Sequence, residues 1–441
     1  MRVTLIGGGG FRTPLIYGEL LRRRSRLPVT EVAVTDPDQQ RAELMASVLR
    51  QMPTDGVPAP AVVVHADQES ALTDADVVLV AARVGGAAGR VHDETVALAA
   101  GAIGQETTGA GGVAYGLRSV PAMVELARSI VRRAPDAWVV NFTNPVSMVT
   151  EAMAAELGDR VIGVCDSPLA LCRRVARALR VDPADVWFDY VGLNHLGWLR
   201  RAVVDGRDRL PDLLADSVTL EQVEEGAIFG AAWCQALGMI PNEYLRYYYQ
   251  RDSALRAMQA APQTRGQFLA EQQGAFYAAA AAEPARAYAI WQAACQERDD
   301  TYMADARQEA GYHGHTADDS VGYSGVALDV VEALTTGVPS VHILNVRNQG
   351  AVTGLDEDAV VEVPCVVDGG GAHPCAVGEV PGHPLGLMTT VKGVERDTIA
   401  AARHGDRQAA WRALASHPLV PSVRVAAQLL DGYWPPVGGG A

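Results

Sequence analysis

The stretch from residue 161 to residue 195 reads VIGVCDSP at its start (161–168) and YVGLNH at its end (190–195), and the rest of the chain is organised around it. Both ends are short apolar runs, and the segment between them is long enough for a helix, which is typical of a strand–helix–strand unit. If the two strands belong to one sheet, they bring Cys165 and His195 to the same edge of that sheet.

Cys165 and His195 together form a candidate metal site. A thiolate and an imidazole both bind first-row metals, and two protein ligands leave coordination positions open for a substrate. The alternative is a buried cysteine beside a core histidine whose hydrogen bonds are satisfied, which is the commoner arrangement for either residue alone. The remainder of the sequence has to decide between the two.

The first 36 residues predict a dinucleotide-binding unit. A strand at 3–6 leads through a glycine run into a helix that begins near Thr13, and such a turn lets a pyrophosphate approach the helix N-terminus. The next strand, at 31–36, ends in Asp36, where an acidic residue binds the ribose of NAD rather than NADP. A plain strand-to-helix turn and an ordinary turn carboxylate are the alternatives. The candidate cofactor-binding residues are Gly7, Gly8, Gly9, Gly10, Phe11, Arg12 and Asp36.

Apolar runs at 61–64 and 76–81 continue the strands, and their unbroken apolar character suits a parallel sheet that is covered on both faces. The predicted fold class is α/β: a Rossmann-like doubly wound parallel sheet with a mainly helical α+β C-terminal domain. At 441 residues the chain is long enough for two lobes. We expect an NAD-binding domain over 1–198 and a substrate and oligomerisation domain over 199–441.

The C-terminal half is expected to be mainly helical. The apolar periodicity predicts helices at 221–237 and 267–282. The segments 341–345 and 360–367 are expected to form strands of an added antiparallel sheet.

Polar side chains follow several of the predicted N-terminal strands. The strand at 137–145 ends in amides that include Asn144, and Cys165 and His195 end the next two strands. Arg90 lies in the loop that leaves the strand at 76–81 and is a candidate anion contact, although loop arginines are more often solvated. Core strands need only apolar residues, so this repetition indicates an active site at one edge of the sheet.

Composition narrows the classes of partner and compartment. The formal charge of -15 argues against nucleic acid and anionic membranes as partners. The chain enters a strand at once and contains no run of eighteen apolar residues, so we expect a cytoplasmic protein. Six cysteines are sparse and irregularly spaced, and a disulfide framework is not expected.

With these residues assembled, the chain resembles the NAD- and metal-dependent family 4 glycoside hydrolases over nearly its whole length. The resemblance is carried by residues 7–10, 83–86, 103–107, 141–145, 165–168, 192–195, 241–249 and 417–422. This family is an exception to the usual two-carboxylate mechanism of glycosidases.

The resemblance implies hydrolysis by internal redox chemistry. NAD+ takes hydride from C3 of the sugar, the C2 proton is removed, the C1 substituent is eliminated, water adds, and the retained NADH reduces the ketone. Mn2+ or another divalent metal, held by Cys165 and His195, would stabilise the enediolate as a Lewis acid. Homodimers or homotetramers are implied as well.

Motif matches assign further roles. Tyr244 would be the base at C2 and Asp166 the acid at the leaving group. Tyr244 is typical of members that cleave β-glycosides, whereas an aspartate after the metal cysteine is commoner in α-acting members, and we favour the tyrosine. The residues that would position substrate and metal-bound water are Glu106, Asn144 and Asn194, and Arg90 would meet a 6-phosphate.

The expected activity is therefore that of a 6-phospho-β-glucosidase. One departure favours an unphosphorylated glycoside instead: Asp318 and Asp319 stand where phosphosugar members usually carry an arginine, and carboxylates repel a phosphate. A conventional NAD-dependent 2-hydroxy-acid dehydrogenase and a non-catalytic NAD-binding protein are the competing classes. Neither explains the pairing of Cys165 with His195.

Overall fold

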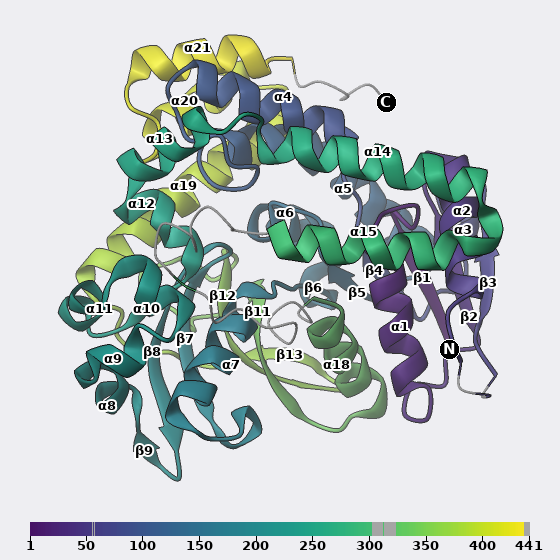
Figure 1. Ribbon diagram of the computed structural model, residues 1–441, viewed down its shortest axis with the longest axis horizontal. Helices are drawn as coiled ribbons and strands as arrows, with labels where there is room; N and C mark the ends of the chain where they lie inside the picture. Colours follow the sequence, from purple (N-terminus) through teal and green to yellow (C-terminus); the bar gives the residue numbers. More distant parts are fainter. Residues whose placement is uncertain (55, 57, 302–311, 313–322, 436–441) are drawn as a thin grey trace.

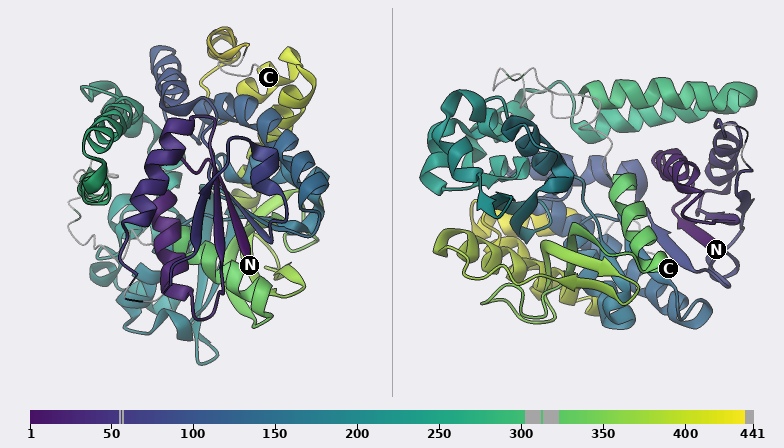
Figure 2. Two further views of the ribbon diagram at one scale, coloured as in Figure 1. Left: turned by 90° about the vertical axis from the view of Figure 1, so that its right-hand side faces the viewer. Right: turned by 90° about the horizontal axis from the view of Figure 1, so that it is seen from below.

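The computed structural model describes residues 1–54, 56, 58–301, 312 and 323–435 (Figure 1). A mixed sheet runs through the middle of the molecule, and helices cover both of its faces (Figure 2). Among the described residues its strands follow the order β10-β8-β7-β12-β11-β6-β5-β4-β1-β2-β3, with β13 paired to β12 and β9 paired to β8.

One half of this sheet is the predicted parallel sheet. Its order, β3-β2-β1-β4-β5-β6, is that of a Rossmann fold, and every pair in it is parallel. The four residues of β4 are all buried, as expected for a strand covered on both faces. The predicted fold class is therefore confirmed. The strands are β1 (Arg2–Ile6), β2 (Glu31–Thr35), β3 (Ala61–Val64), β4 (Val77–Val80), β5 (Trp138–Asn141) and β6 (Val161–Gly163).

Helices connect these strands, and two of them, α2 and α3, begin at side-chain caps. The carboxylate of Asp38 accepts a hydrogen bond from the Arg41 N–H (3.1 Å) where α2 begins, and Asp67 accepts from the Ser70 N–H (2.8 Å) at α3. The connecting helices are α1 (Thr13–Arg23), α2 (Gln39–Arg50), α3 (Gln68–Leu72), α4 (Gly86–Ala99), α5 (Ala110–Arg133), α6 (Val146–Leu157) and α7 (Ser167–Leu179).

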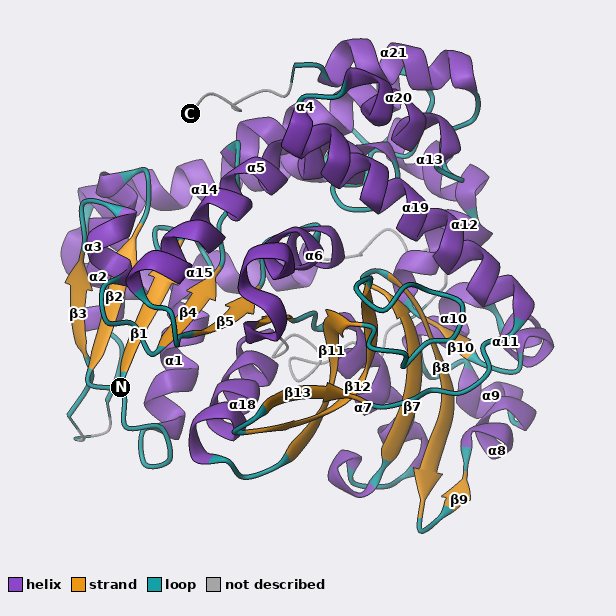
Figure 3. Ribbon diagram, turned by 180° about the vertical axis from the view of Figure 1, so that it is seen from behind, coloured by secondary structure: helices purple, strands orange, loops and turns teal. Residues whose placement is uncertain are grey.

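The other half of the sheet is antiparallel, and it differs from our expectation of a separate added sheet. β11 and β12 pair antiparallel, as predicted, but they lie between β6 and β7 in the same sheet (Figure 3). Single register pairs join them to their neighbours, Asn345 to Gly163 and Glu362 to Gly192. The strands are β7 (Trp187–Leu193), β8 (Leu196–Val204), β9 (Arg207–Asp208), β10 (Ile240–Pro241), β11 (Ser340–Arg347), β12 (Val360–Asp368) and β13 (Gly371–Pro374).

The position of β12 has a physical reason. Residues 360–365 are all buried, so both faces and both edges of the strand need neighbours. The largest core cluster consequently runs through both halves of the chain, from Val3 in β1 to Trp198 in β8 and Val363 in β12. The predicted boundary between two domains near residue 198 stays a prediction, because strands from both sides of this boundary form one sheet.

The C-terminal half is mainly helical, as predicted, but the expected helix at 221–237 is broken. Gly230, with φ +78°, ends α10 and starts α11, a backbone conformation that few other residues adopt. No helix in the described part of the chain is long and apolar enough to cross a bilayer. The helices are α8 (Leu210–Ala215), α9 (Ser217–Leu220), α10 (Glu224–Phe229), α11 (Ala231–Leu237), α12 (Arg246–Tyr249), α13 (Arg251–Ala260), α14 (Arg265–Ala282), α15 (Ala287–Thr301), α18 (Tyr323–Thr336), α19 (Gly382–His404), α20 (Arg407–Ser416) and α21 (Val423–Tyr433).

The hairpin formed by α14 and α15 reaches back across the Rossmann half (Figure 1). Its Tyr277 hydroxyl donates to the carbonyl oxygen of Gly9 (2.6 Å), and its Trp291 indole N–H donates to that of Phe11 (2.9 Å). The ring of Phe276 packs edge-on against Phe11, with centroids 5.4 Å apart. The hairpin therefore covers the glycine loop.

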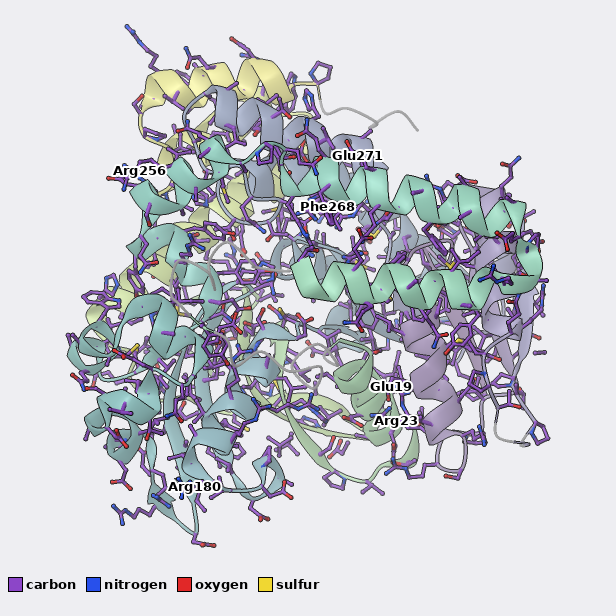
Figure 4. The ribbon with its side chains drawn as sticks, viewed as in Figure 1. Glu19, Arg23, Arg180, Arg256, Phe268 and Glu271 are labelled. Atoms are coloured by element: carbon purple, nitrogen blue, oxygen red, sulfur yellow. The ribbon has the colours of Figure 1, made fainter. Side chains whose placement is uncertain are left out.

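A second contact ties the two halves together at α1. Figure 4 labels Glu19 and Arg23 on this helix. Arg23 forms an ion pair with Glu19 and donates to Asp329 of α18 at 2.8 Å. Since the side chain of Arg23 is only 13% exposed, this pair is screened less by solvent than a surface pair would be.

Lys392 on α19 is the only lysine among the 37 lysines and arginines of the chain. It is buried, and its ammonium lies 2.8 Å from Glu151 and 3.2 Å from the Ser147 hydroxyl of α6, with a third contact to Glu395. Three oxygen partners match the three N–H donors of an ammonium, whereas the planar fork of arginine would need more room.

We expect Lys392→Met to lower the free energy of unfolding by about 3–5 kcal/mol, because it removes the cation that pairs with the buried carboxylate of Glu395. Lys392→Arg should also destabilise, by about 1–3 kcal/mol, through overpacking. Urea denaturation measures both. The matched control is Arg407→Met, which breaks the exposed pair with Asp431 and should cost less than about 1 kcal/mol. A Lys392→Met protein as stable as the control would contradict this role.

Candidate active site

A cavity of about 870 Å³ lies between the glycine loop, the neighbouring loops of the Rossmann half and the α14–α15 hairpin. It brings together side chains that the sequence analysis selected from distant segments. Those that line it are Phe11, Arg12, Arg90, Glu106, Asn144, Asp166, His195 and Tyr244. The convergence of so many selected polar groups on one cavity makes it the candidate active site.

The glycine loop occupies one end of this region. Gly7 adopts φ +75°, and a Cβ added there would lie 2.7 Å from the Cα of Ala82, so the turn after β1 needs glycine. The carboxylate of Asp36 accepts hydrogen bonds from the N–H groups of Gly9 (3.1 Å) and Asp38 (2.9 Å). Asp36, which follows β2, therefore stabilises the glycine loop in addition to any contact with a ribose.

His195 lies in the two-residue turn of the hairpin that joins β7 to β8. It adopts φ +61°, which is uncommon for a residue with a side chain. Its ring stacks on that of Tyr244, with centroids 3.6 Å apart and planes 3° from parallel. Its Nδ1 lies 2.7 Å from the Thr107 hydroxyl, while its buried Nε2 has no hydrogen-bond partner.

The route by which His195 reaches the site differs from the one expected. β7 runs antiparallel to β6, because each step from β6 through β11 and β12 to β7 reverses direction. The imidazole is therefore delivered by a hairpin turn, not by the carboxyl end of a parallel strand. Asp166 and His195 nevertheless line the same cavity.

Cys165 and Asp166 follow β6. The thiol of Cys165 is buried, and burial, followed by the carboxyls of Glu362 and Asp166, raises its pKa well above the ordinary value. Asp166 occupies the N-cap position of α7, but its carboxylate does not cap the helix and instead lines the cavity. Removal of the thiol proton therefore needs a nearby positive charge, such as a metal ion.

Glu362 is a buried residue near the site that the sequence analysis missed. Glu362 lies on β12, opposite Gly192 of β7. Its carboxylate accepts hydrogen bonds from Asn345 (2.8 Å) and Tyr190 (3.3 Å). Burial raises its pKa to about 7, against the amides of Asn345 and Asn194, which favour the charged form. The signal was a glutamate inside the apolar run at 360–367, where a core strand needs no polar residue.

Glu243, next to Tyr244, was also missed. It lines the cavity; one carboxyl oxygen accepts from the Ser167 hydroxyl (2.7 Å), and the other is buried without a partner. Burial, followed by the nearby Glu225, raises its pKa to about 8. Arg174, which is itself paired with Glu225 (3.0 Å), lowers the pKa of Glu243 by less than burial and Glu225 raise it.

Basic residues gather at the end of the cavity near Phe11 and Arg12. Glu106 pairs there with Arg83 (2.6 Å) and Arg90 (3.0 Å), and Arg90 also pairs with Glu94 (2.7 Å). Burial raises the pKa of Glu106, but Arg83 and Arg90 outweigh it and hold the pKa below its ordinary value. Arg90, the predicted phosphate contact, is thus already engaged by two carboxylates.

Arg298 of α15 lies at the same end, with its guanidinium 5.5 Å from the centroid of the Phe11 ring. Burial, followed by the positive charges of neighbouring arginines, lowers its pKa to about 9. These neighbours are Arg12, Arg83, Arg90 and Arg265. Such a concentration of positive charge fits an anionic ligand.

The donor set fits a first-row metal. The unpartnered Nε2 of His195 is an available ligand atom, and the buried Cys165 supplies a soft sulfur ligand once deprotonated. In the described ranges no group of three or more histidine, cysteine or carboxylate side chains could hold a metal ion. A metal bound by Cys165 and His195 alone would therefore complete its coordination with substrate and water.

Comparison with known proteins adds the family to this geometry. Residues 2–181 match the model of family 4 glycosyl hydrolases, and residues 190–420 match that of the family's C-terminal domain. The chain belongs to glycosyl hydrolase family 4. This family 4 protein is therefore a glycosidase, which decides against the dehydrogenase and the non-catalytic NAD-binding protein.

Its relatives include both α- and β-acting enzymes. The chain is 32% identical to a probable 6-phospho-β-glucosidase of Bacillus subtilis, over 98% of its own length and 95% of the relative's. It is 29% identical to a 6-phospho-α-glucosidase of Leptotrichia buccalis, over 98% of each. The structure of the Thermotoga maritima 6-phospho-β-glucosidase with manganese, NAD+ and glucose-6-phosphate matches with a TM-score of 0.81 at 28% identity, covering 98% of this chain and 97% of that one.

The raised pKa of the Glu243 carboxyl leads to a prediction about the stability of this family 4 enzyme. A carboxyl whose pKa is raised in the folded state contributes stability below its unfolded pKa and loses it as pH rises through the folded value, here about 8. Glu243→Gln keeps a neutral side chain at every pH. Its melting temperature should therefore rise relative to wild type between about pH 5 and pH 9.

Calorimetry at several pH values measures this difference. The matched control for the loss of one carboxylate is Glu271→Gln, at an exposed position on α14 (Figure 4). A difference between Glu243→Gln and wild type that stays constant with pH would show that Glu243 does not retain its proton in the folded protein.

Proposed function

We propose that this enzyme hydrolyses 6-phospho-β-glucosides with NAD+ and Mn2+ as cofactors. The observation that carries the proposal is the stacked pair of His195 and Tyr244, whose imidazole keeps an unpartnered Nε2, on a cavity that extends to the glycine loop. A metal ligand, a candidate base and a dinucleotide site then share one space. The relatives named above, and the Thermotoga maritima structure with manganese, NAD+ and glucose-6-phosphate, support the same function.

In this proposal Cys165 and His195 hold the metal, and residues 7–12 with Asp36 hold the dinucleotide. When bound, NAD+ supplies a hydride acceptor and the metal supplies Lewis-acid stabilisation of negative charge. The glycine loop orients the dinucleotide, and the α14–α15 hairpin that covers this loop restricts the entry of water. Coverage of the glycine loop by this hairpin favours retention of the dinucleotide, which a reaction with cancelling redox steps requires.

Tyr244 takes up the proton from C2 of the sugar. Its ring is buried and stacked on His195, so its hydroxyl is held on a rigid support near the metal site. Asp166 gives a proton to the leaving group at the same cavity. Asn144, whose buried Oδ1 has no partner, accepts from a sugar hydroxyl, while Asn194 lies beside His195 and helps to position the substrate.

The 6-phosphate on the substrate is the more specific part of the proposal. Asp318 and Asp319, which favour an unphosphorylated sugar, lie outside the described residues. Support for an anionic substituent comes from the gathering of arginines around Phe11, where the positive charges of Arg12, Arg83, Arg90 and Arg265 all act on Arg298. Hydrolysis of an unphosphorylated glycoside by the same residues is the second candidate.

The remaining proposals concern the location of the protein and its oligomeric state. Cys165 must stay reduced to hold a metal, which supports a cytoplasmic location. A homodimer or homotetramer is proposed from family resemblance alone.

The test compares 4-nitrophenyl β-glucoside with its 6-phosphate, and with both α-anomers, each with NAD+, Mn2+ and a thiol reductant. We expect cleavage of the phosphorylated β-substrate, exchange of the C2 proton with deuterated water, and no net NADH. Cleavage of only unphosphorylated sugars would contradict the phosphate assignment. Net NADH without cleavage would contradict the mechanism.

Arg298→Gln should weaken binding of a phosphate-bearing ligand about 10- to 100-fold, the equivalent of one charge-assisted hydrogen bond. Titration calorimetry with NAD+ and with glucose-6-phosphate separately shows which of the two ligands Arg298 contacts. The control is Arg286→Gln, which removes an exposed arginine of the same hairpin that pairs with Glu283. Unchanged affinity for both ligands would contradict a role for Arg298.

A further inference from the structure

Thr107 makes a contact that the proposed reaction does not use. Its hydroxyl oxygen lies 2.7 Å from Nδ1 of His195, a residue 88 positions later in the chain. The same oxygen lies 3.0 Å from Oε1 of Gln105. Thr107 therefore stands between a side-chain amide and a candidate metal ligand.

The orientation of the Gln105 amide is fixed by two backbone donors. The N–H groups of Thr107 and Thr108 both point at Oε1, each with a nitrogen–oxygen distance of 2.6 Å. The opposite orientation would set an NH2 group against two N–H groups, which is repulsive. Oε1 is therefore an oxygen acceptor where it meets the Thr107 hydroxyl.

The direction of the next hydrogen bond follows. A hydroxyl has one proton, and Thr107 donates it to Oε1 of Gln105, since two lone pairs would otherwise face each other at 3.0 Å. The hydroxyl oxygen is then left to accept, so Nδ1 of His195 must be the donor. A neutral imidazole that carries its proton on Nδ1 presents a lone pair on Nε2.

That lone pair lies on the nitrogen atom that would bind the metal. Nε2 of His195 is buried and has no hydrogen-bond partner. With the other tautomer, Nε2 would be a buried donor without an acceptor, which costs about 1–3 kcal/mol. The chain Gln105–Thr107–His195 thus selects the tautomer in which Nε2 can bind a metal.

We propose that Thr107, held by Gln105, is a positioning residue that sets the tautomer and the ring orientation of His195 for metal binding. The proposal rests on the proposed metal site and extends it. The turn that carries His195 has φ +61°, a strained backbone conformation that persists only where surrounding contacts hold the residue. Tyr244 fixes the plane of the ring by stacking, and Thr107 fixes the rotation within that plane.

The test substitutes Thr107→Val, which keeps the shape of the side chain and removes the hydroxyl. Mn2+ affinity, measured by calorimetry with no sugar present, should fall about 10- to 100-fold, as expected when a partner behind a metal ligand is lost. Thr107→Ser keeps the hydroxyl and should restore most of the affinity. Thr108→Val is the matched control, because its buried hydroxyl has no hydrogen-bond partner and the chemical change is the same.

Nitrogen-15 NMR of the metal-free protein provides a readout that activity and folding do not determine. In wild type and Thr107→Ser the proton of His195 should reside on Nδ1, and in Thr107→Val it should be distributed over both nitrogens. Wild-type Mn2+ affinity in Thr107→Val, or a proton on Nε2 in wild type, would overturn the proposal. A wild-type protein that binds no Mn2+ but carries the proton on Nδ1 would contradict the proposed metal chemistry instead.

Discussion

The structure depends on a row of four residues that crosses the middle of the sheet: Gly163 in β6, Asn345 in β11, Glu362 in β12 and Gly192 in β7. The pair Gly163–Asn345 at one end joins the Rossmann half to the antiparallel half, and the pair Glu362–Gly192 at the other end joins β12 to β7 within the antiparallel half. An open sheet edge would leave unpaired N–H and C=O groups in the core, so neither half could end at this point without a partner. A Cβ added at Gly163 would lie 2.8 Å from the Cβ of Asn345, and one added at Gly192 would clash with the backbone of Gly197 in β8, so both ends of the row need glycine.

The polar members of this row lie close to the candidate site. Glu362 is completely buried, yet it lies within electrostatic reach of Cys165 and Asp166, and beside Asn194. A core strand would be more stable with an apolar residue there, because burial of a carboxyl is costly. The retained carboxyl therefore links the architecture to the site: the joint between the two halves also supports the residues that follow β6 and β7.

The parts of the fold and of the candidate site that depend on patterns over a few neighbouring residues could be predicted from the sequence. The Rossmann strands, the glycine turn and α14 follow from periodicity and turn chemistry over a few residues. The insertion of β11 and β12 depends on pairing between segments about 180 residues apart, which no local pattern encodes. Glycines at 192 and 197 around a two-residue Asn–His turn are a hairpin signal, and attention to it would have placed His195 correctly. The contact of Thr107 with His195 exists only in three dimensions.

The charges in the cavity separate toward its two ends. Arginines from α4, α14, α15 and the glycine loop gather near Phe11, whereas Asp166, Glu224 and Glu243 line the region near Tyr244. Carboxylates suit sugar hydroxyls because they accept several hydrogen bonds, and arginines suit phosphates. The pyrophosphate of NAD+ would neutralise part of the positive end. A 6-phosphate on the sugar would find complementary charge among these arginines, which favours a substrate orientation with C6 toward the cofactor and the hydroxyls toward Tyr244.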